Sequence, residues 1–171
     1  MYMNRVCVIG CPGSGKSTFS RALRDITGLP LFYLDMLYHR PDRTTVSREE
    51  FDRRLSEILV QDCFILDGNY ARTLERRLSH SDTVFFLDYP VEVCLEGIEA
   101  RRGNPREDMP WVETKCDEDF LQFVKSFRES IRPQILAMLG RFPQIKQIML
   151  HKRDEANQFL QALKLEERND E

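Results

Sequence analysis

The sequence reads Gly10-Cys11-Pro12-Gly13-Ser14-Gly15-Lys16-Ser17 near its N-terminus, and this stretch decides the fold. It fits the pattern G-x-x-x-x-G-K-[ST], a loop that binds phosphate. An apolar run, Val6 to Ile9, precedes the loop, and apolar residues at helical spacing follow it. The motif requires a strand before it and a helix after it, so this context supports the match. The sequence therefore predicts a nucleotide phosphate site at the first strand-to-helix connection.

The residue types of this loop suit a nucleotide with its metal ion. Glycine permits backbone conformations in which successive N–H groups point at phosphate oxygens, and the following helix directs the positive end of its dipole to the same place. Lys16 can reach the β- and γ-phosphates, and the hydroxyl of Ser17 suits Mg²⁺. We therefore expect ATP and Mg²⁺ as cofactors. The expected contact residues are Gly10, Cys11, Pro12, Gly13, Ser14, Gly15, Lys16, Ser17 and Thr18.

The totals of the chain are typical of one globular domain and exclude several classes of protein. Of the 171 residues, 42% are hydrophobic and 31% are charged, which predicts a single domain over 1–171. The chain has no run of 18 apolar residues, so we expect no membrane partner. The net charge of −3 and the lack of a basic block disfavour direct binding to nucleic acid.

The cysteines and the N-terminus indicate the compartment. The five cysteines share no paired spacing, which is typical of a reducing environment. The N-terminus runs directly into the first apolar run and leaves no room for a secretory signal. We expect a cytoplasmic protein that is a monomer or a homodimer. Cys116 is the only cysteine in the polar segment 103–118, which excludes a four-cysteine zinc site there.

Apolar runs alternate with helical patterns along the chain, as in α/β proteins built from βαβ units. The expected strands are 4–9, 31–34, 63–67, 83–88 and 145–150. The expected helices begin at Lys16, at a capping box formed by Ser47 and Glu50, at Asn69, at Pro90 and before Phe120, with a break near Pro133 and a last helix around Phe159. This alternation predicts a five-stranded parallel sheet with helices on both faces, a three-layer αβα arrangement.

Carboxylates follow two of the expected strands. Ligands of such a sheet bind at the carboxyl ends of its strands, where Asp35 and Asp67 stand. Phosphoryl transfer needs a carboxylate near the metal and often another that orients or deprotonates the accepting hydroxyl. We expect Asp67 to help hold Mg²⁺ and Asp35 to act on the acceptor. The alternative at both positions is a carboxylate that only caps a turn.

Arginines supply the positive charge that a transferring phosphoryl group needs. Arg101 and Arg106 flank or lie in the polar segment 103–118, and Arg132 lies beyond it. If the segment closes as a lid, these arginines reach the phosphates and water is excluded. Taken singly, each is more often a solvated surface residue. Candidates for holding the acceptor are Arg72, Tyr38 and Tyr70.

Several longer stretches resemble one group of proteins. They are 8–17, Leu34-Asp35-Met36-Leu37-Tyr38, 65–73, 86–88, 101–102 and Ser130-Ile131-Arg132-Pro133. Over residues 4–163 the chain resembles the P-loop nucleoside and nucleotide kinases of the adenylate-kinase type, and more closely the bacterial DNA topology modulation proteins. The resemblance implies the P-loop NTPase fold, a short substrate-binding insertion at 35–62 and a lid at 103–118.

The stretch after the third strand carries the acceptor residues in this resemblance. Asp67-Gly68 is similar to the start of Asp-Gly-Phe-Pro-Arg in adenylate kinases, but Asn69-Tyr70-Ala71 replaces Phe-Pro and Arg72 comes one residue late. The implied acceptor-binding residues are Asp35, Tyr38, Asp67, Gly68, Asn69, Tyr70 and Arg72. The departures leave the acceptor open between a nucleoside, a nucleotide and a small hydroxylated metabolite.

The leading hypothesis is a kinase that moves the γ-phosphoryl group of ATP·Mg²⁺ to this small-molecule acceptor. Its catalytic residues would be Lys16, Asp35, Arg101, Arg106 and Arg132, and its metal residues Ser17 and Asp67. The alternative is an ATP-binding regulatory switch that acts through a protein or DNA partner, as the topology-modulation resemblance implies. A signalling GTPase is excluded because the chain has no Asn-Lys-x-Asp to read guanine.

Overall fold

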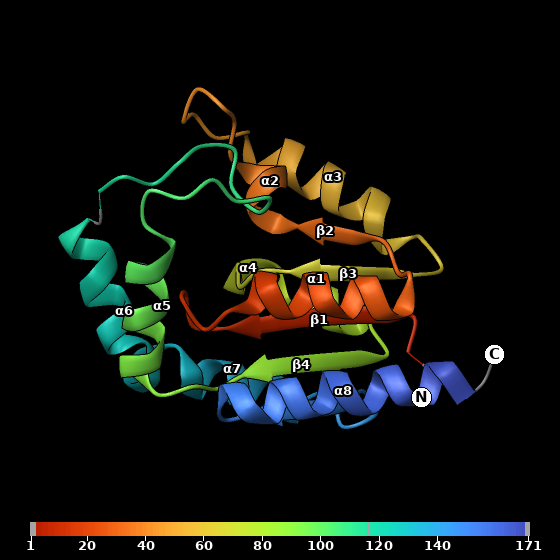
Figure 1. Cartoon of the computed structure of the whole chain (residues 1–171). Helices are drawn as coiled ribbons and strands as arrows, with labels where there is room; N and C mark the ends of the chain where they lie inside the picture. The colour runs from red at the N-terminus through yellow and green to blue at the C-terminus, as the bar shows by residue number, and fades with distance from the viewer. Residues whose placement is uncertain (1–2, 116, 170–171) are drawn as a thin grey trace.

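Five parallel strands form the centre of the protein (Figure 1). The computed structural model describes residues 3–115 and 117–169, so Cys116 and the zinc argument attached to it lie outside the described residues. The spatial order of the strands is β2-β3-β1-β4-β5, and every neighbouring pair is parallel, as predicted. The strands are β1 (Arg5–Gly10), β2 (Leu31–Tyr33), β3 (Phe64–Asp67), β4 (Thr83–Leu87) and β5 (Lys146–Leu150).

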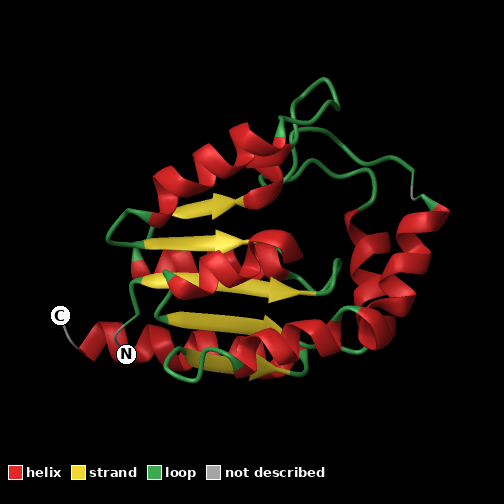
Figure 2. Cartoon of the chain, turned by 180° about the vertical axis from the view of Figure 1, so that it is seen from behind, coloured by secondary structure: helices red, strands yellow, loops and turns green. Residues whose placement is uncertain are grey.

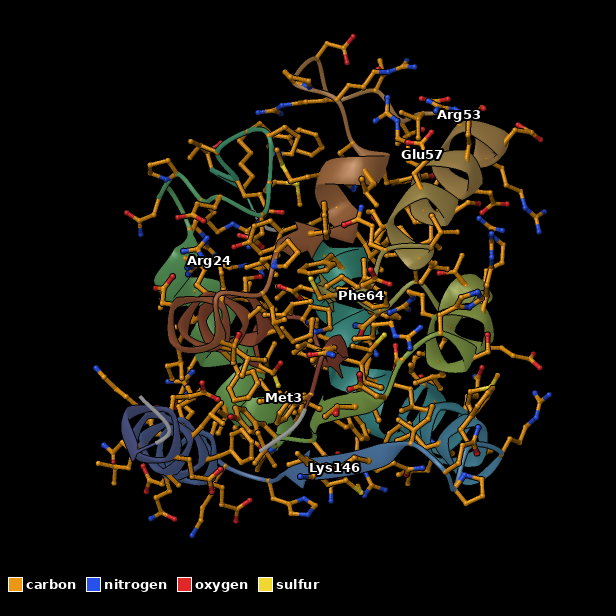
Figure 3. The ribbon with its side chains drawn as sticks, turned by 90° about the vertical axis from the view of Figure 1, so that its right-hand side faces the viewer. Met3, Arg24, Arg53, Glu57, Phe64 and Lys146 are labelled. Carbon is orange, nitrogen blue, oxygen red and sulfur yellow. The ribbon has the colours of Figure 1, made fainter. Side chains whose placement is uncertain are left out.

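Helices cover both faces of the sheet. Figure 3 shows the sheet nearly on edge, with α1 and α8 on one side and α3, α4 and α7 on the other. Helices α5 and α6 stand side by side at the carboxyl ends of the strands (Figures 1 and 2). The predicted three-layer αβα arrangement is therefore confirmed. The helices are α1 (Lys16–Thr27), α2 (Leu34–Tyr38), α3 (Arg48–Leu59), α4 (Ala71–Ser79), α5 (Val91–Arg101), α6 (Glu118–Ser130), α7 (Arg132–Gly140) and α8 (Arg153–Asn169).

The core lies around the three central strands. Every residue of β1 after Arg5 is buried, as is every residue of β3 and β4. These strands are continuous apolar runs because helices pack on both of their faces. Phe85 of β4 contacts Phe19 of α1 and Phe159 of α8, with ring centroids 4.9 and 5.0 Å apart. The candidate site thus lies at the edge of strands whose side chains are packed on both faces of the sheet.

Two helix boundaries follow the sequence signals. Helix α1 ends at Gly28, which has a φ of 71° and donates its N–H to the carbonyl of Arg24 at 2.8 Å. A left-handed residue at this position is the common end of a helix and favours glycine. Helix α3 begins after Ser47, whose hydroxyl accepts the N–H of Glu50 at 3.1 Å. The predicted helix start at the Ser47–Glu50 capping box is confirmed.

Other boundaries differ from the prediction. The second strand ends at Tyr33, which pairs with Asp67, the last residue of β3. Because no strand partner remains beyond this pair, the chain turns into helix α2, and Asp35 lies in its first turn instead of at a strand end. Helix α4 begins at Ala71 and not at Asn69, since Tyr70 has a φ of 34°. Pro90 precedes helix α5 and is not its first residue.

The long polar segment after α5 has no helix or strand in its described part. It leaves the end of α5, reaches the region of α2, and returns to α6 (Figure 1). Two backbone hydrogen bonds hold its start: Gly103 donates its N–H to the carbonyl of Glu113 at 2.8 Å, and Asn104 donates its N–H to the carbonyl of Arg101 at 3.2 Å. The segment therefore spans the edge of the sheet that carries the phosphate loop. None of the described helices combines the length and the hydropathy needed to cross a membrane.

Candidate active site

The phosphate loop joins β1 to α1 with one packed face and one open face. Gly13 has a φ of 84°, and a Cβ there would lie 2.0 Å from the carbonyl oxygen of Cys94 on α5. Gly15 has a φ of 88°, and a Cβ there would meet no atom within 4 Å. Only glycine allows both the close approach to α5 and the left-handed turn into α1. The loop is therefore open at Gly15, where α1 begins, and the N-terminus of a helix suits an anion.

Lys16 lies across the mouth of this loop. Its Nζ donates to the carbonyl oxygens of Gly10 at 3.0 Å and Cys11 at 3.2 Å. The first turn of α1 contains no acidic residue to neutralise it. Phosphate oxygens are stronger acceptors for an ammonium group than these carbonyls, because both partners are charged. The remaining predicted residues Pro12, Ser14 and Thr18 lie on the same loop and the first turn of the helix.

Asp67 supplies a buried carboxylate beside the loop. Its side chain ends β3, opposite Val8 of β1, and only 4% of the residue is exposed. Within the described part of the chain its Oδ2 has no hydrogen-bond partner. Burial raises the pKa of Asp67 to about 6, although nearby Lys16 and the Ser17 hydroxyl lower it. A bound cation would satisfy this carboxylate oxygen, which lies next to a hydroxyl and an open phosphate loop.

These donors fit Mg²⁺ held together with a nucleotide. The described residues contain no group of three or more His, Cys, Asp or Glu side chains placed to hold a metal ion alone. Mg²⁺ does not require one, since it keeps several waters and binds through one or two protein oxygens plus substrate phosphates. Ser17 and Asp67 are the predicted residues that fit this arrangement, and the structure brings them together.

The polar segment adds a carboxylate that sequence reasoning missed. Asp108 is 7% exposed, and its Oδ2 accepts a hydrogen bond from Ser17 Oγ at 2.9 Å. Arg106 Nη1 lies 3.4 Å from the same oxygen. The residue stands in a loop without periodicity, 91 positions from its partner, so no local signal marks it. It brings the polar segment onto the phosphate loop.

Two of the three predicted lid arginines lie on this side. Arg106 also contacts Glu113 at 3.0 Å, and Arg101 Nε lies 3.7 Å from the same carboxylate. Burial and the neighbouring Arg106 lower the pKa of Arg101, and its Nε has no hydrogen-bond partner in the described residues. Two guanidinium groups thus converge on one carboxylate near Asp108. Arg106 is linked to the phosphate loop through Asp108, which accepts from Ser17.

Arg132, the third predicted arginine, pairs with a carboxylate at the end of β4. Its Nε and Nη2 bind both oxygens of Asp88 at 2.8 to 2.9 Å, and the Asp88 side chain is 5% exposed. Asp88 directly follows β4, and Arg132 is the first residue of α7. The pair therefore ties α7 to the end of the sheet. It lines a small crevice that Cys11 of the phosphate loop also lines.

One turn joins the phosphate loop to the acceptor carboxylate. The Oδ1 of Asn69 accepts the N–H of Gly10 at 3.1 Å, and the hydroxyl of Tyr70 donates to Asp35 Oδ1 at 2.7 Å. The predicted residues Gly68, Asn69, Tyr70 and Asp35 are therefore neighbours in space. A second residue that the sequence did not reveal, Arg77, is fully buried and donates to the carbonyls of Gly68, Asn69 and Tyr70.

A cavity of about 430 Å³ opens beside this turn. Its aromatic wall is formed by Tyr38, Tyr70 and Phe51, with the Phe51 and Tyr70 rings stacked at 5.1 Å. Arg72, predicted to hold an acidic acceptor, lines the cavity but binds both oxygens of Asp52 at 3.0 and 2.6 Å. Arg48, a missed residue on the first turn of α3, is the second arginine of the lining. The remaining lining residues are Val46, Ala71 and Thr73.

Known proteins with similar sequences are nucleotide kinases. The chain is 34% identical over 117 residues to a cytidylate kinase of Halorubrum lacusprofundi, covering 58% of this chain and 59% of that protein. It is 31% identical over 89 residues to adenylate kinases of Thermotoga petrophila and Thermotoga maritima, covering 50% of this chain and 40% of each relative. The chain thus matches between two fifths and three fifths of the length of these curated relatives. No protein-family model matches the sequence.

Solved structures with a similar fold are also kinases. A shikimate kinase from Acinetobacter baumannii, in complex with shikimate, has a TM-score of 0.64 at 18% identity, over 98% of this chain and 94% of that one. A shikimate kinase from Bacteroides thetaiotaomicron has a TM-score of 0.58 at 16% identity, over 96% and 98%. At such identities the likeness shows the fold. The phosphate loop, the parallel sheet and the sequence matches to nucleotide kinases together support the P-loop nucleotide kinase group that the sequence resembles.

Proposed function

We propose that this chain transfers the γ-phosphoryl group of ATP·Mg²⁺ to a small acceptor, a nucleoside, a nucleotide or a hydroxylated metabolite. One observation carries the proposal. A single turn holds Gly10 of the phosphate loop through Asn69 and holds Asp35 through Tyr70, the next residue. The donor phosphates would therefore bind next to Asn69 and the acceptor hydroxyl next to Tyr70, so that adjacent residues of one turn would hold the two substrates close together. A regulatory switch has no comparable observation in its favour.

On the donor side, backbone N–H groups of residues 13–18 would bind the phosphates, and Lys16 would exchange its two carbonyl partners for phosphate oxygens. Ser17 and Asp67 would hold Mg²⁺, which supplies positive charge at the phosphate oxygens. Arg106 lies on the segment that covers the loop and Arg101 at the end of α5 beside it, and their charge would stabilise the transferring group. Arg132 contributes to the proposal only by anchoring α7 to Asp88.

On the acceptor side, Asp35 would accept the proton of the attacking hydroxyl. The hydroxyl of Tyr70 fixes one of its oxygens and leaves the other available. The adjoining cavity, at about 430 Å³, has room for a small ring compound, and its aromatic wall suits a planar or partly apolar one. Insertion 35–62 and lid 103–118 would close over the two substrates and exclude water.

The test is a screen for ADP release. The purified protein is given ATP·Mg²⁺ with nucleosides, nucleotides and hydroxylated metabolites in turn. One acceptor should stimulate ADP release in a dose-dependent manner. The Lys16→Ala variant should lose at least about a hundredfold of this turnover, because it removes a charge that acts on the transition state. Lys152→Ala, which removes an exposed lysine far along the chain, is the matched control. Stimulation by no acceptor, or full turnover by Lys16→Ala, contradicts the proposal.

A further inference from the structure

Asp108, which no local sequence signal marks, reaches the phosphate loop from the polar segment after α5. The segment 103–115 runs from α5 across the carboxyl edge of the sheet (Figure 1). At its inner end the Asp108 Oδ2 accepts the proton of Ser17 Oγ at 2.9 Å. The residue is 7% exposed, so this contact is buried and not a surface encounter. The neighbouring Arg106, at 3.4 Å, balances part of its charge.

The preceding carboxylate in the same segment faces elsewhere. Glu107 accepts from Arg24 Nη1 at 3.3 Å and from the Tyr33 hydroxyl at 3.4 Å, and its side chain is 58% exposed. Arg24 lies on the outer part of α1 (Figure 3). Glu107 thus fastens the segment to α1 and β2, and Asp108 alone of the two reaches Ser17. A substitution of Glu107 is therefore a matched control for a substitution of Asp108, the next residue.

A second, independent observation points to a cation at the same place. Asp67, 4% exposed, carries an Oδ2 without a hydrogen-bond partner in the described part of the chain. Asp67 lies close to Ser17, Lys16 and Asp108. Two buried carboxylates therefore lie close to one hydroxyl, one from the sheet and one from the covering segment. A cation bound at this place would reduce the repulsion between them.

The direction of the hydrogen bond at Ser17 suits such a cation. A serine hydroxyl has one proton to donate and two lone pairs. Because Asp108 takes the proton, the lone pairs of Oγ are free for a metal ion. Outer groups that orient a metal ligand in this way affect metal affinity strongly. On the basis of the proposed function, we propose that Asp108 belongs to the Mg²⁺ site. Asp108 orients the Ser17 hydroxyl, and its contact makes closure of segment 103–115 part of metal binding.

The experiment measures nucleotide binding and not turnover. Calorimetry gives the Kd of ADP in EDTA and in Mg²⁺, and their ratio is the gain due to the metal. The ratio should fall at least about tenfold in Asp108→Ala. Asp108→Asn, which keeps an oxygen for the Ser17 proton but loses the charge, should retain part of the gain. Glu107→Gln should keep the wild-type ratio. Circular dichroism and thermal unfolding verify that each variant is folded.

Two negative results are distinguishable. A wild-type ratio in both Asp108 variants overturns the role of Asp108 and leaves the kinase proposal standing. Wild-type protein that binds no nucleotide in either condition overturns the kinase proposal and this inference together. A ratio reduced equally by Glu107→Gln also overturns the inference, because it would show that any loosening of the segment has the same effect.

Discussion

The side-chain oxygen Oδ1 of Asn69 accepts the backbone N–H of Gly10 at 3.1 Å, and so joins the turn after β3 to the start of the phosphate loop. Gly10 pairs in the sheet with Leu87 on its other side. The first residue of the loop is thus fixed from both neighbouring strands. The geometry of the phosphate site depends on a side chain 59 positions away.

Replacing Asn69 by Ala should weaken nucleotide binding and destabilise the fold. The Gly10 N–H would lose its partner in a part-buried place, at a cost of about 1–2 kcal/mol in the free energy of unfolding. The Kd for ADP·Mg²⁺ should rise about threefold to tenfold, since the loop backbone loses its anchor. Urea unfolding and calorimetry measure the two effects. Asn157→Ala, on the exposed face of α8, is the control, and equal effects from both variants would contradict the argument.

Arg77 should prove essential to the stability of the same turn. It is fully buried and its guanidinium serves three successive carbonyls and Thr73 Oγ1. Burial lowers the pKa of Arg77. Arg77→Lys keeps a charge but cannot reach all of these acceptors, and should lower the free energy of unfolding by about 2–4 kcal/mol. Arg76→Lys, on the exposed side of the same helix, should change it by less than about 0.5 kcal/mol. Urea unfolding compares the two variants. An unchanged free energy of unfolding in Arg77→Lys would refute the view that the Arg77 guanidinium holds this turn.

Tyr70→Phe should separate the acceptor step from nucleotide binding. It removes only the hydroxyl that holds Asp35 at 2.7 Å. A hydrogen bond to a charged group contributes about 1.5–3 kcal/mol, so kcat/KM for the acceptor should fall about tenfold to a hundredfold. The Kd for ADP·Mg²⁺ should not change. Tyr33→Phe, which loses a 3.4 Å contact with exposed Glu107, is the control. A rise in the nucleotide Kd that accounts for the whole loss would contradict this division.

The sequence predicts those parts of the fold that depend on near neighbours. Gly28 ends α1, and the Ser47–Glu50 pair begins α3. Both act through contacts within four residues, so local sequence patterns indicate them. The five parallel strands follow from the alternation of apolar runs with helical patterns. Asp67 was also readable, because a carboxylate directly after a buried strand must lie at the carboxyl edge.

The missed parts depend on contacts between distant segments. Asp108 meets Ser17 across 91 positions, and nothing in a polar loop indicates which of its carboxylates turns inward. Arg77 reads as one of two adjacent arginines on an amphipathic helix, and only its burial distinguishes it from Arg76. The sequence predicts Asp35 at a strand end, but the pairing of β2 with β3 stops at Tyr33, where β3 ends. The length of β3 cannot be inferred from the residues around Asp35.

Asp67 should make the stability of the metal-free protein depend on pH. Its pKa is about 6 in the folded state and 3.8 in the unfolded state, so the folded state binds the proton more tightly. The stabilisation is complete below about pH 4 and is lost as pH rises through about 6, a change of at most about 3 kcal/mol. Asp67→Asn should therefore be more stable than wild type at about pH 7.5, and the difference should vanish toward about pH 4.

Urea unfolding in EDTA across this pH range measures the Asp67 effect. Asp62→Asn, on the exposed approach to β3, is the matched control and should follow the wild-type curve. A difference between Asp67→Asn and wild type that stays constant with pH would mean that the buried carboxyl does not titrate in this range.

The pair between Arg132 and Asp88 should act on stability and not on transfer. Both oxygens of a carboxylate that is 5% exposed are bound by one guanidinium, so removing Arg132 leaves a buried charge with only His151 Nδ1 nearby among the described residues, at 3.7 Å. Arg132→Ala should lower the free energy of unfolding by about 3 kcal/mol, and Arg132→Ala with Asp88→Ala should recover part of the loss. Arg128→Ala, exposed on α6, is the control. A catalytic Arg132 would give the opposite pattern, in which acceptor-stimulated ADP release collapses, the unfolding curve stays in place, and the double variant shows no coupling.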